Sequence, residues 1–160
     1  ADTRATGGTT VVEKNADKIH RIAPNIFCCG AGTAADTRAV TGMIESDLAN
    51  QRLAMGKQSR VVGALTRAKR HLFRYQGHVS AALILGGVDV TGPKVMTVSP
   101  HGNSDSFPFC SMGSGSLACL GWLEANYKDN MTKEEAMDMM HKGISRGIME
   151  DEGSGFNVDL

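Results

Sequence analysis

The sequence predicts an α+β fold, a four-layer α-β-β-α sandwich in which pairs of helices cover antiparallel sheets. Three observations support this class. The expected elements run in the order strands, two helices, strands, two helices, strand. Apolar residues recur at three- and four-residue spacing in the helical segments, whereas the strands are short and bounded by glycines. This order favours helices layered on antiparallel sheets over a doubly wound parallel sheet.

Short strands separated by tight turns occupy the N-terminal part of the chain. The segment Gly7-Gly8-Thr9-Thr10 reads as a turn, although a Gly-Thr bond is also the bond that self-processing threonine hydrolases cut. A later apolar strand leads into Gly30-Ala31-Gly32. The strands are expected at residues 1–6, 9–12, 18–22 and 25–29.

Two helices follow, at about 33–55 and 59–75. In the first, apolar residues recur at four-residue spacing from Val40 to Leu48, and Gly56 is suited to end the helix. The second helix has one apolar face, and its opposite face, from Arg60 to Arg74, is basic. This basic face is expected to be solvated or to face another subunit rather than nucleic acid.

The second half of the chain begins with strands and a third helix. These elements are expected at 79–87, 94–99, 107–112 and 113–127, the strands at 94–99 and 107–112 forming an antiparallel pair.

A fourth helix is marked by its start signal. Thr132 and Glu135 form a capping box, which predicts a helix ending near Met149. Its buried stripe is expected to contain Ala136, Met139 or Met140, Ile144 and Ile148. Another strand is expected to begin at Asn157. Because the expected sheets start and stop within strands, residues 1–160 are interpreted as a single domain that is incomplete at both ends.

Composition excludes several classes of protein. Apolar residues make up 41% and charged residues 21%, and Lys plus Arg equals Asp plus Glu at 17 each, so no net charge attracts nucleic acid or an anionic membrane. No apolar run is long enough to span a bilayer. The four cysteines have no metal-binding spacing, and the adjacent Cys28 and Cys29 would face opposite sides of a strand, so buried reduced thiols are expected rather than zinc.

One glycine-rich segment allows two interpretations. Gly30 to Ala35 matches G-x-G-x-x-A between a strand and a helix, the position of a dinucleotide fingerprint. The acidic residue that this fingerprint needs about 20 residues later would fall within the first helix, where no second parallel strand is expected. A glycine turn whose N–H groups face an oxyanion or a peptide is the better use of this geometry.

Several polar residues have both a structural and a catalytic interpretation. Asp2 and Lys18 lie on adjacent expected strands, where they form either a structural ion pair or a pair that activates a hydroxyl nucleophile. Asp151 and Ser154 either orient a base or belong to the turn after the fourth helix. Ser114 is either a helix N-cap or a catalytic hydroxyl.

Seven segments spread over the whole chain favour the catalytic interpretation of these residues over the structural one. They lie at 1–6, 18–20, 28–37, 72–77, 86–93, 112–116 and 153–155. Together they resemble the eukaryotic 20S proteasome, in particular its catalytic β-type subunits of the trypsin-like type, which are N-terminal nucleophile hydrolases.

The resemblance implies a threonine endopeptidase with no cofactor and no metal. In that family the mature chain begins with a Thr whose Oγ is the nucleophile and whose α-amino group is the base; its place is before Ala1, so it is missing here. Lys18 would lower the pKa of the nucleophile, and Asp2 would hold Lys18. The residues that would support the terminal amine and its water are Ser114, Asp151 and Ser154.

The resemblance also implies a substrate site. The N–H of Gly32 would form the oxyanion hole, and Thr6, Gly32 and Ala34 would align the substrate backbone as an added strand. Arg38 departs from the family, which usually has an acidic residue there, and an arginine would repel a basic P1 side chain. The specificity pocket would be lined by Ala5, Ala16, His20, Gly30, Ala34 and Arg38.

These implications lead to one expected function and two alternatives. The expected function is cleavage of unfolded or ubiquitin-tagged polypeptides, after basic residues. Expected partners are α-type and β-type subunits in stacked heptameric rings and regulatory particles bound through the α rings, in the cytoplasm and nucleus, with neither nucleic acid nor membrane as a partner. The first alternative is a catalytically silent, structural β-type subunit. The second is a subunit of a bacterial two-ring threonine protease.

Overall fold

The computed structural model describes all residues from Ala1 to Leu160 and divides into two compact units. The first unit contains residues 1–18 and 111–160, and the second contains residues 19–110. Both units combine helices with antiparallel strands, so the predicted α+β class is confirmed.

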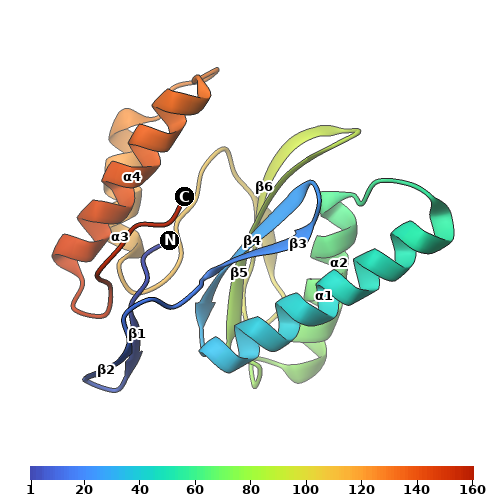
Figure 1. Cartoon of the computed structure of the whole chain (residues 1–160), viewed down its shortest axis with the longest axis horizontal. Helices are drawn as coiled ribbons and strands as arrows, with labels where there is room; N and C mark the ends of the chain where they lie inside the picture. The colour runs from blue at the N-terminus through green and yellow to red at the C-terminus, as the bar shows by residue number, and fades with distance from the viewer. The chain divides into compact units, whose positions relative to one another are not determined.

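The second unit is built on one five-stranded sheet in which every pair of neighbours is antiparallel (Figure 1). The strands follow their order in the chain; short turns connect β3 to β4, β5 to β6 and β6 to β7, whereas both helices of this unit lie between β4 and β5. Two of these turns have only two residues, Pro24-Asn25 between β3 and β4 and Val90-Thr91 between β5 and β6. The strands are β3 (Ile19–Ala23), β4 (Ile26–Gly32), β5 (Ala81–Asp89), β6 (Gly92–Val98) and β7 (Ser104–Ser106).

Two helices, α1 (Ala34–Met55) and α2 (Val61–Tyr75), lie on the same face of this sheet (Figure 1). Gly56 ends α1 in the left-handed conformation, with φ of 61°, as its sequence position predicts. The predicted apolar stripes of both helices are confirmed, and they form the core against alternate residues of β4 and β5. The largest fully buried side chains of this core are Ile22, Ile26, Val40, Ile44, Leu48, Val61, Leu72, Leu83, Leu85 and Val98.

The first unit contains a hairpin and two packed helices. The hairpin strands are β1 (Ala5–Gly7) and β2 (Thr10–Glu13), joined through Gly8 at φ of 64°, so the Gly-Gly segment is a turn as predicted. The helices are α3 (Ser116–Asn126) and α4 (Lys133–Glu150), which pack against each other. The predicted capping box at the start of α4 is present, since the Thr132 hydroxyl accepts from the Glu135 N–H and the Glu135 carboxylate accepts from the Thr132 N–H.

Two predicted strands are wrong. Instead of the strand expected from Asn157, only an isolated bridge between Val158 and Asp2 is formed. The partner of β6 is β7 at Ser104–Ser106, not residues 107–112. Phe107 still donates its N–H to the Val95 carbonyl at 3.1 Å, but Pro108 follows it and has no N–H to continue the ladder. The polar Ser-Asp-Ser segment pairs at an edge, where no apolar face marks it as a strand.

The predicted buried stripe of α4 is partly wrong. Met139 is buried, but the other buried positions are Gly143 and Gly147, whereas Ile144 and Ile148 are only partly buried. A Cβ on Gly143 would lie 3.3 Å from the Cys119 Sγ and 3.4 Å from the Leu123 side chain. The face of α4 that touches α3 therefore carries glycines instead of large apolar side chains, because the two helices approach closely there.

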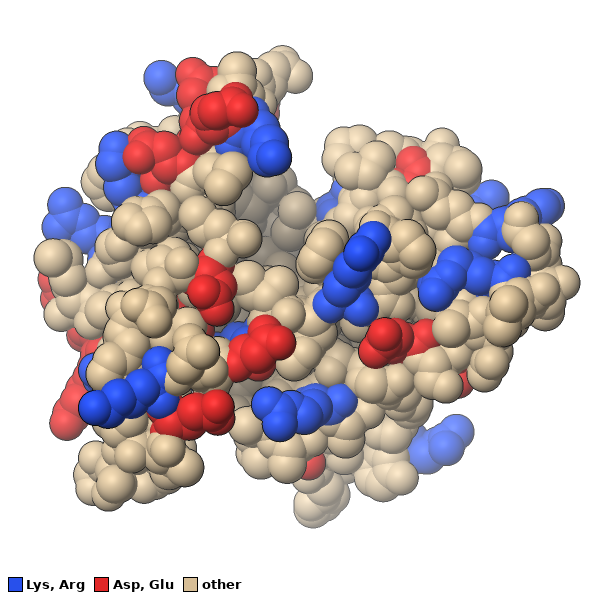
Figure 2. Space-filling view, viewed as in Figure 1, with Lys and Arg blue, Asp and Glu red and all other residues tan.

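The surface agrees with a formal net charge of zero. Figure 2 shows acidic and basic side chains close together on the visible face. None of the helices combines the length and apolar character needed to cross a membrane. None of the four cysteines forms a disulfide; Cys28 and Cys119 are buried and Cys29 and Cys110 are partly buried.

Candidate active site

An ion pair between Lys18 and Asp2 lies in the first unit. Lys18 Nζ is 2.7 Å from Asp2 Oδ1, and the side chains are 27% and 14% exposed. Lys18 belongs to the segment between β2 and β3, and Asp2 forms an isolated antiparallel bridge with Val158. The contact that the sequence suggested is therefore present, although neither residue lies within a long strand.

The Asp2 carboxylate is fixed at its second oxygen as well. Oδ2 accepts the N–H of Gly155 at 3.0 Å and the N–H of Arg4 at 3.2 Å. Hydrogen bonds from three different segments orient this carboxylate, so Lys18 Nζ is held at one place. Sequence reasoning missed Gly155 in this role, because a backbone donor leaves no signal in residue type.

A second cluster gathers around Asp151, which follows α4. Its Oδ2 accepts from Ser114 Oγ at 2.5 Å and from Ser154 Oγ at 2.6 Å. The Ser114 hydroxyl, followed by that of Ser154, keeps the pKa of the Asp151 carboxyl below its ordinary value. Each hydroxyl uses its proton toward Asp151, so its oxygen lone pairs remain able to accept a hydrogen bond from an amine or a water.

Helix packing brings Ser114 to Asp151. The N-cap of α3 is Gly115, not Ser114, and no side chain caps this end, so the N-cap interpretation of Ser114 is wrong. A Cβ on Gly115 would lie 3.1 Å from the Gly147 carbonyl oxygen, and a Cβ on Gly147 would lie 3.2 Å from the Gly115 carbonyl oxygen. The two glycines let the start of α3 approach the last turn of α4, where Asp151 follows.

Arg4 contacts the segment 152–156 at both of its ends. Its Nη1 donates to the Glu152 carbonyl at 2.7 Å, and its guanidinium lies 4.7 Å from the centre of the Phe156 ring, a cation–π contact. A Cβ on Gly155 would overlap this guanidinium, so a larger residue there would require the Arg4 side chain to move. Sequence reasoning did not identify Arg4, because a basic residue near a strand usually reads as a solvated charge.

The two clusters are joined by one peptide unit. The Ser154 hydroxyl donates to Asp151, and the next residue, Gly155, donates its N–H to Asp2. The five polar residues predicted from the sequence are thus assembled within one unit, and none of them comes from the second unit. They are Asp2, Lys18, Ser114, Asp151 and Ser154.

Three predicted substrate-binding residues also belong to the first unit. Ala5 and Thr6 lie on β1, where Thr6 is exposed. Ala16 is only 8% exposed, and its N–H donates to the Thr3 carbonyl at 2.9 Å.

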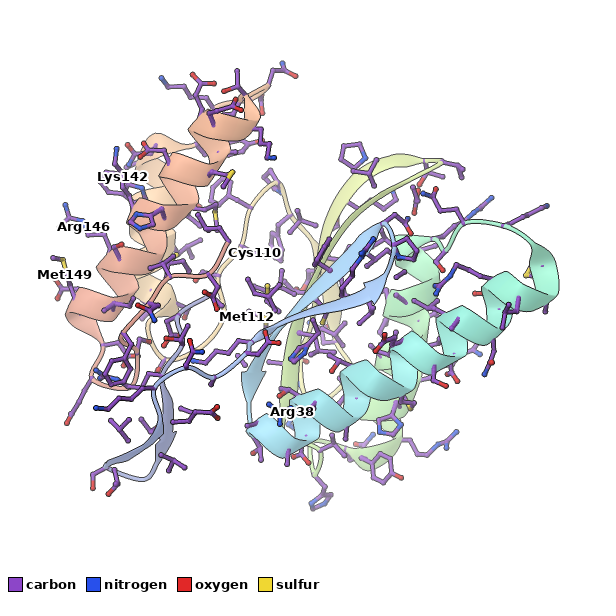
Figure 3. The ribbon with its side chains drawn as sticks, viewed as in Figure 1. Arg38, Cys110, Met112, Lys142, Arg146 and Met149 are labelled. Atoms are coloured by element: carbon purple, nitrogen blue, oxygen red, sulfur yellow. The ribbon has the colours of Figure 1, made fainter.

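The remaining substrate-binding predictions fall within the second unit. His20 lies on β3, Gly30 and Gly32 on β4, and Ala34 and Arg38 on the first turns of α1, where both are exposed (Figure 3). Gly32 has φ of 105°, and a Cβ there would lie 2.4 Å from the Ser80 carbonyl oxygen, so the position requires glycine. A Cβ on Gly30 would lie 2.9 Å from the Thr37 Cβ, and its absence lets β4 approach α1.

The geometry limits the chemistry of the chain. A dinucleotide fold is contradicted, because β4 lies between antiparallel neighbours and α1 does not connect parallel strands. No His, Cys, Asp or Glu side chains gather in a group of three or more that could hold a metal ion. The first unit instead offers a fixed ammonium and two oriented hydroxyls, groups suited to stabilising an oxyanion and positioning an amine or water.

Known proteins resemble the chain over its whole length. The family described as "Proteasome: Proteasome subunit" matches residues 1–160. Proteasome subunit beta type-7-B of Arabidopsis thaliana is 58% identical over 160 residues, which are 100% of this chain and 58% of that protein. Proteasome subunit beta type-7 of Dictyostelium discoideum is 58% identical over 100% of this chain and 60% of its own length. Proteasome subunit beta type-2 of Saccharomyces cerevisiae is 49% identical over 100% of this chain and 61% of its own length. The chain thus spans about three-fifths of the length of these relatives.

Proposed function

The chain belongs to the proteasome subunit family, and from this membership we propose that it is part of a catalytic β-type subunit, a threonine endopeptidase. The observation that carries this proposal is the joining of the Lys18–Asp2 pair and the Asp151 cluster through the Ser154–Gly155 peptide. A fixed ammonium and two oriented hydroxyls within one compact unit support hydrolysis by a hydroxyl nucleophile.

The proposed nucleophile is a threonine at the mature N-terminus, on the segment that precedes Ala1 in the full-length protein. Its Oγ attacks the carbonyl carbon of the peptide bond while its proton passes through a water to the terminal α-amino group. The ammonium of Lys18, held by Asp2, stabilises the developing alkoxide by electrostatic attraction. The N–H of Gly32 is proposed to donate to the oxyanion of the tetrahedral intermediate.

The Asp151 cluster is proposed to serve the base. The Ser114 and Ser154 oxygens accept hydrogen bonds from the α-ammonium that forms, or from the bridging water. Collapse of the intermediate breaks the C–N bond, the leaving amine takes the proton, and an ester to threonine remains. A water activated by the same amine then hydrolyses this ester and releases the second product.

Cleavage after basic residues is the proposed specificity, with Ala5, Ala16, His20, Gly30, Ala34 and Arg38 as pocket residues and Thr6, Gly32 and Ala34 as backbone contacts. Proposed substrates are unfolded and ubiquitin-tagged polypeptides. Proposed partners are α-type and β-type subunits in stacked heptameric rings, with regulatory particles on the α rings, in the cytoplasm and nucleus.

A structural, catalytically silent subunit is the competing proposal. The Lys18–Asp2 pair argues against it. A partly buried lysine loses side-chain entropy and hydration when it is held by a carboxylate, and a structural subunit gains little stability in return, about 1 kcal/mol or less. The hydroxyls of Ser114 and Ser154 donate to the Asp151 carboxylate and not to the free carbonyls at the end of α4, so they do not cap the helix.

A lysine substitution tests the proposed function. Lys18→Ala in the full-length subunit, assembled with its neighbours, should lower hydrolysis of peptides by this subunit at least about 10³-fold. Lys142→Ala is the matched control, because Lys142 also forms a 2.7 Å ion pair, with Asp138, on an exposed face of α4 (Figure 3). Its activity should stay within about twofold of the parent, because exposed pairs contribute little. If particles assembled with Lys18→Ala keep all of the peptide hydrolysis of the parent particles, this subunit contributes none of it, as the silent-subunit proposal expects.

A further inference from the structure

Thr3 lies between Asp2 and Arg4 in the chain and is fully buried, with 0% of its surface exposed. Its hydroxyl uses both of its hydrogen-bonding functions: Oγ1 donates to the Lys14 carbonyl at 2.9 Å and accepts the N–H of Asn157 at 3.1 Å. Neither partner is a reacting group, and the site described above does not use this hydroxyl.

The backbone of Thr3 bonds to the same two segments. Its N–H donates to the Gly155 carbonyl at 3.3 Å, and its carbonyl accepts the N–H of Ala16 at 2.9 Å. Thr3 therefore has two bonds to the segment that leads to Lys18 and two bonds to the segment that follows Ser154. It is the one residue of the first unit whose side chain and backbone both connect these segments.

We propose that Thr3 is a positioning residue of the active site, whose hydroxyl fixes the distance between the segment carrying Lys18 and the segment carrying Ser154 and Gly155. The inference rests on the proposed function, because it assigns Thr3 to the geometry of that same site. Asp2 is the neighbour of Thr3 in the chain and bonds to Lys18 and to the Gly155 N–H. A shift of either segment thus changes the Asp2 contacts, and with them the place of the Lys18 ammonium.

The hydroxyl is required for physical reasons. Valine has nearly the shape of threonine but neither donates nor accepts a hydrogen bond, so it leaves the Lys14 carbonyl and the Asn157 N–H without this partner. The segments would then move apart to reach water or other partners. Serine keeps the hydroxyl and loses only a methyl group, so the spacing should be preserved.

The test compares Thr3→Val with Thr3→Ser in the full-length subunit assembled with its neighbours. We expect Thr3→Val to lower kcat at least tenfold with KM within about twofold, and to slow covalent labelling by a peptide vinyl sulfone to the same degree. Thr3→Ser should retain kcat within about threefold of the parent. Thr41→Val is the control for removal of a buried threonine hydroxyl, since Thr41 is 3% exposed and donates to the Thr37 carbonyl within α1. Its kcat should match that of the parent.

The outcomes separate a wrong role for Thr3 from a wrong proposed function. If Lys18→Ala abolishes hydrolysis while assembled Thr3→Val keeps the parental kcat, the role of Thr3 is wrong and the proposed function stands. Equal losses in the valine and serine variants would also overturn it, since packing alone would then matter. If Thr3→Val does not assemble, Thr3→Cys replaces it, because a thiol is a weak donor and acceptor; a kcat equal to that of Thr3→Ser would overturn the proposal. If Lys18→Ala retains full activity, the proposed function itself fails.

Discussion

The Ser114 hydroxyl donates a 2.5 Å hydrogen bond to the Asp151 carboxylate, across 37 residues of the chain. Ser114 precedes α3 and Asp151 follows α4, so this bond depends on how closely the two helices approach. The approach occurs where Gly115 faces Gly147, with no side chain between the two backbones. The spacing of one hydroxyl and one carboxylate therefore depends on two glycines that have no chemistry of their own.

Adding a methyl group at this contact should weaken both stability and activity. Gly147→Ala places a Cβ 3.2 Å from the Gly115 carbonyl oxygen, so the helix ends must separate by a few tenths of an ångström. We expect a loss of about 1–3 kcal/mol in the free energy of unfolding and a fall of about tenfold in kcat as Ser114 moves from Asp151. Urea unfolding and peptide hydrolysis by the full-length assembled protein measure the two effects.

Gly121→Ala is the matched control within the same helix pair. Gly121 lies in α3 with nothing within 4 Å of its virtual Cβ, so alanine there should stabilise by about 0.5–1 kcal/mol and leave kcat unchanged. If Gly147→Ala behaved like Gly121→Ala, the close approach would not position Ser114.

Acid should weaken the second unit through Asp89, which is 7% exposed. Bonds from the Thr91 hydroxyl, the Thr91 N–H and the Val61 N–H lower the pKa of Asp89 from 3.8 to about 2. Because the folded pKa lies below the unfolded one, the ionised carboxylate stabilises the fold above pH about 4, and this contribution is lost as pH falls toward about 2.

Asp89→Asn should therefore lower the urea midpoint at pH 7, and the difference from the parent should shrink as the pH falls from about 4 to about 2. The NH₂ group of the asparagine side chain also faces one of the N–H groups that donate to the carboxylate in the parent, so that hydrogen bond is lost. Asp105→Asn is the control, since Asp105 is exposed and accepts a single 3.3 Å bond from Asn103. A difference between Asp89→Asn and parent that did not change with pH would contradict the role of this carboxylate.

Arg38 should limit cleavage after basic residues if it lines the pocket. It is exposed on α1 and takes no part in the ion pairs Lys18–Asp2, Arg67–Asp47 and Lys142–Asp138 (Figure 3). We expect Arg38→Glu to raise the kcat/KM for a fluorogenic peptide ending in Arg, relative to peptides ending in Leu or Glu, by roughly tenfold. An unchanged ratio among the three peptides would show that Arg38 does not face the substrate.

Local signals predicted much of the fold. The Gly56 helix end, the Thr132–Glu135 capping box and the stripes of α1 and α2 are confirmed, because each is set by a few neighbouring residues. The β7 strand was missed because edge pairing of a polar Ser-Asp-Ser segment leaves no alternating pattern. The face of α4 was misassigned because close helix packing buries Gly143 and Gly147 instead of the larger isoleucines.

In the candidate site too, side chains with recognisable chemistry were found from the sequence, whereas backbone and packing roles were not. Residue chemistry marked Asp2, Lys18, Ser114, Asp151 and Ser154 as candidates with both a structural and a catalytic interpretation, and the resemblance to the family supplied their expected roles. The groups that were missed act through the backbone or through packing. Gly155 donates its N–H, and Thr3 is an ordinary strand residue until its burial and its four hydrogen bonds are known.

Chemical identification of the nucleophile decides whether the protein is a threonine endopeptidase. The full-length protein, assembled with its neighbours, is treated with a peptide vinyl sulfone, and the modified residue is located by peptide mass spectrometry together with sequencing of the mature N-terminus. We predict a single adduct on an N-terminal threonine in the segment preceding Ala1, absent when Lys18 is replaced by alanine. A mature N-terminus that is blocked or is not threonine, or an adduct on any other residue, would rule out an N-terminal threonine as the nucleophile.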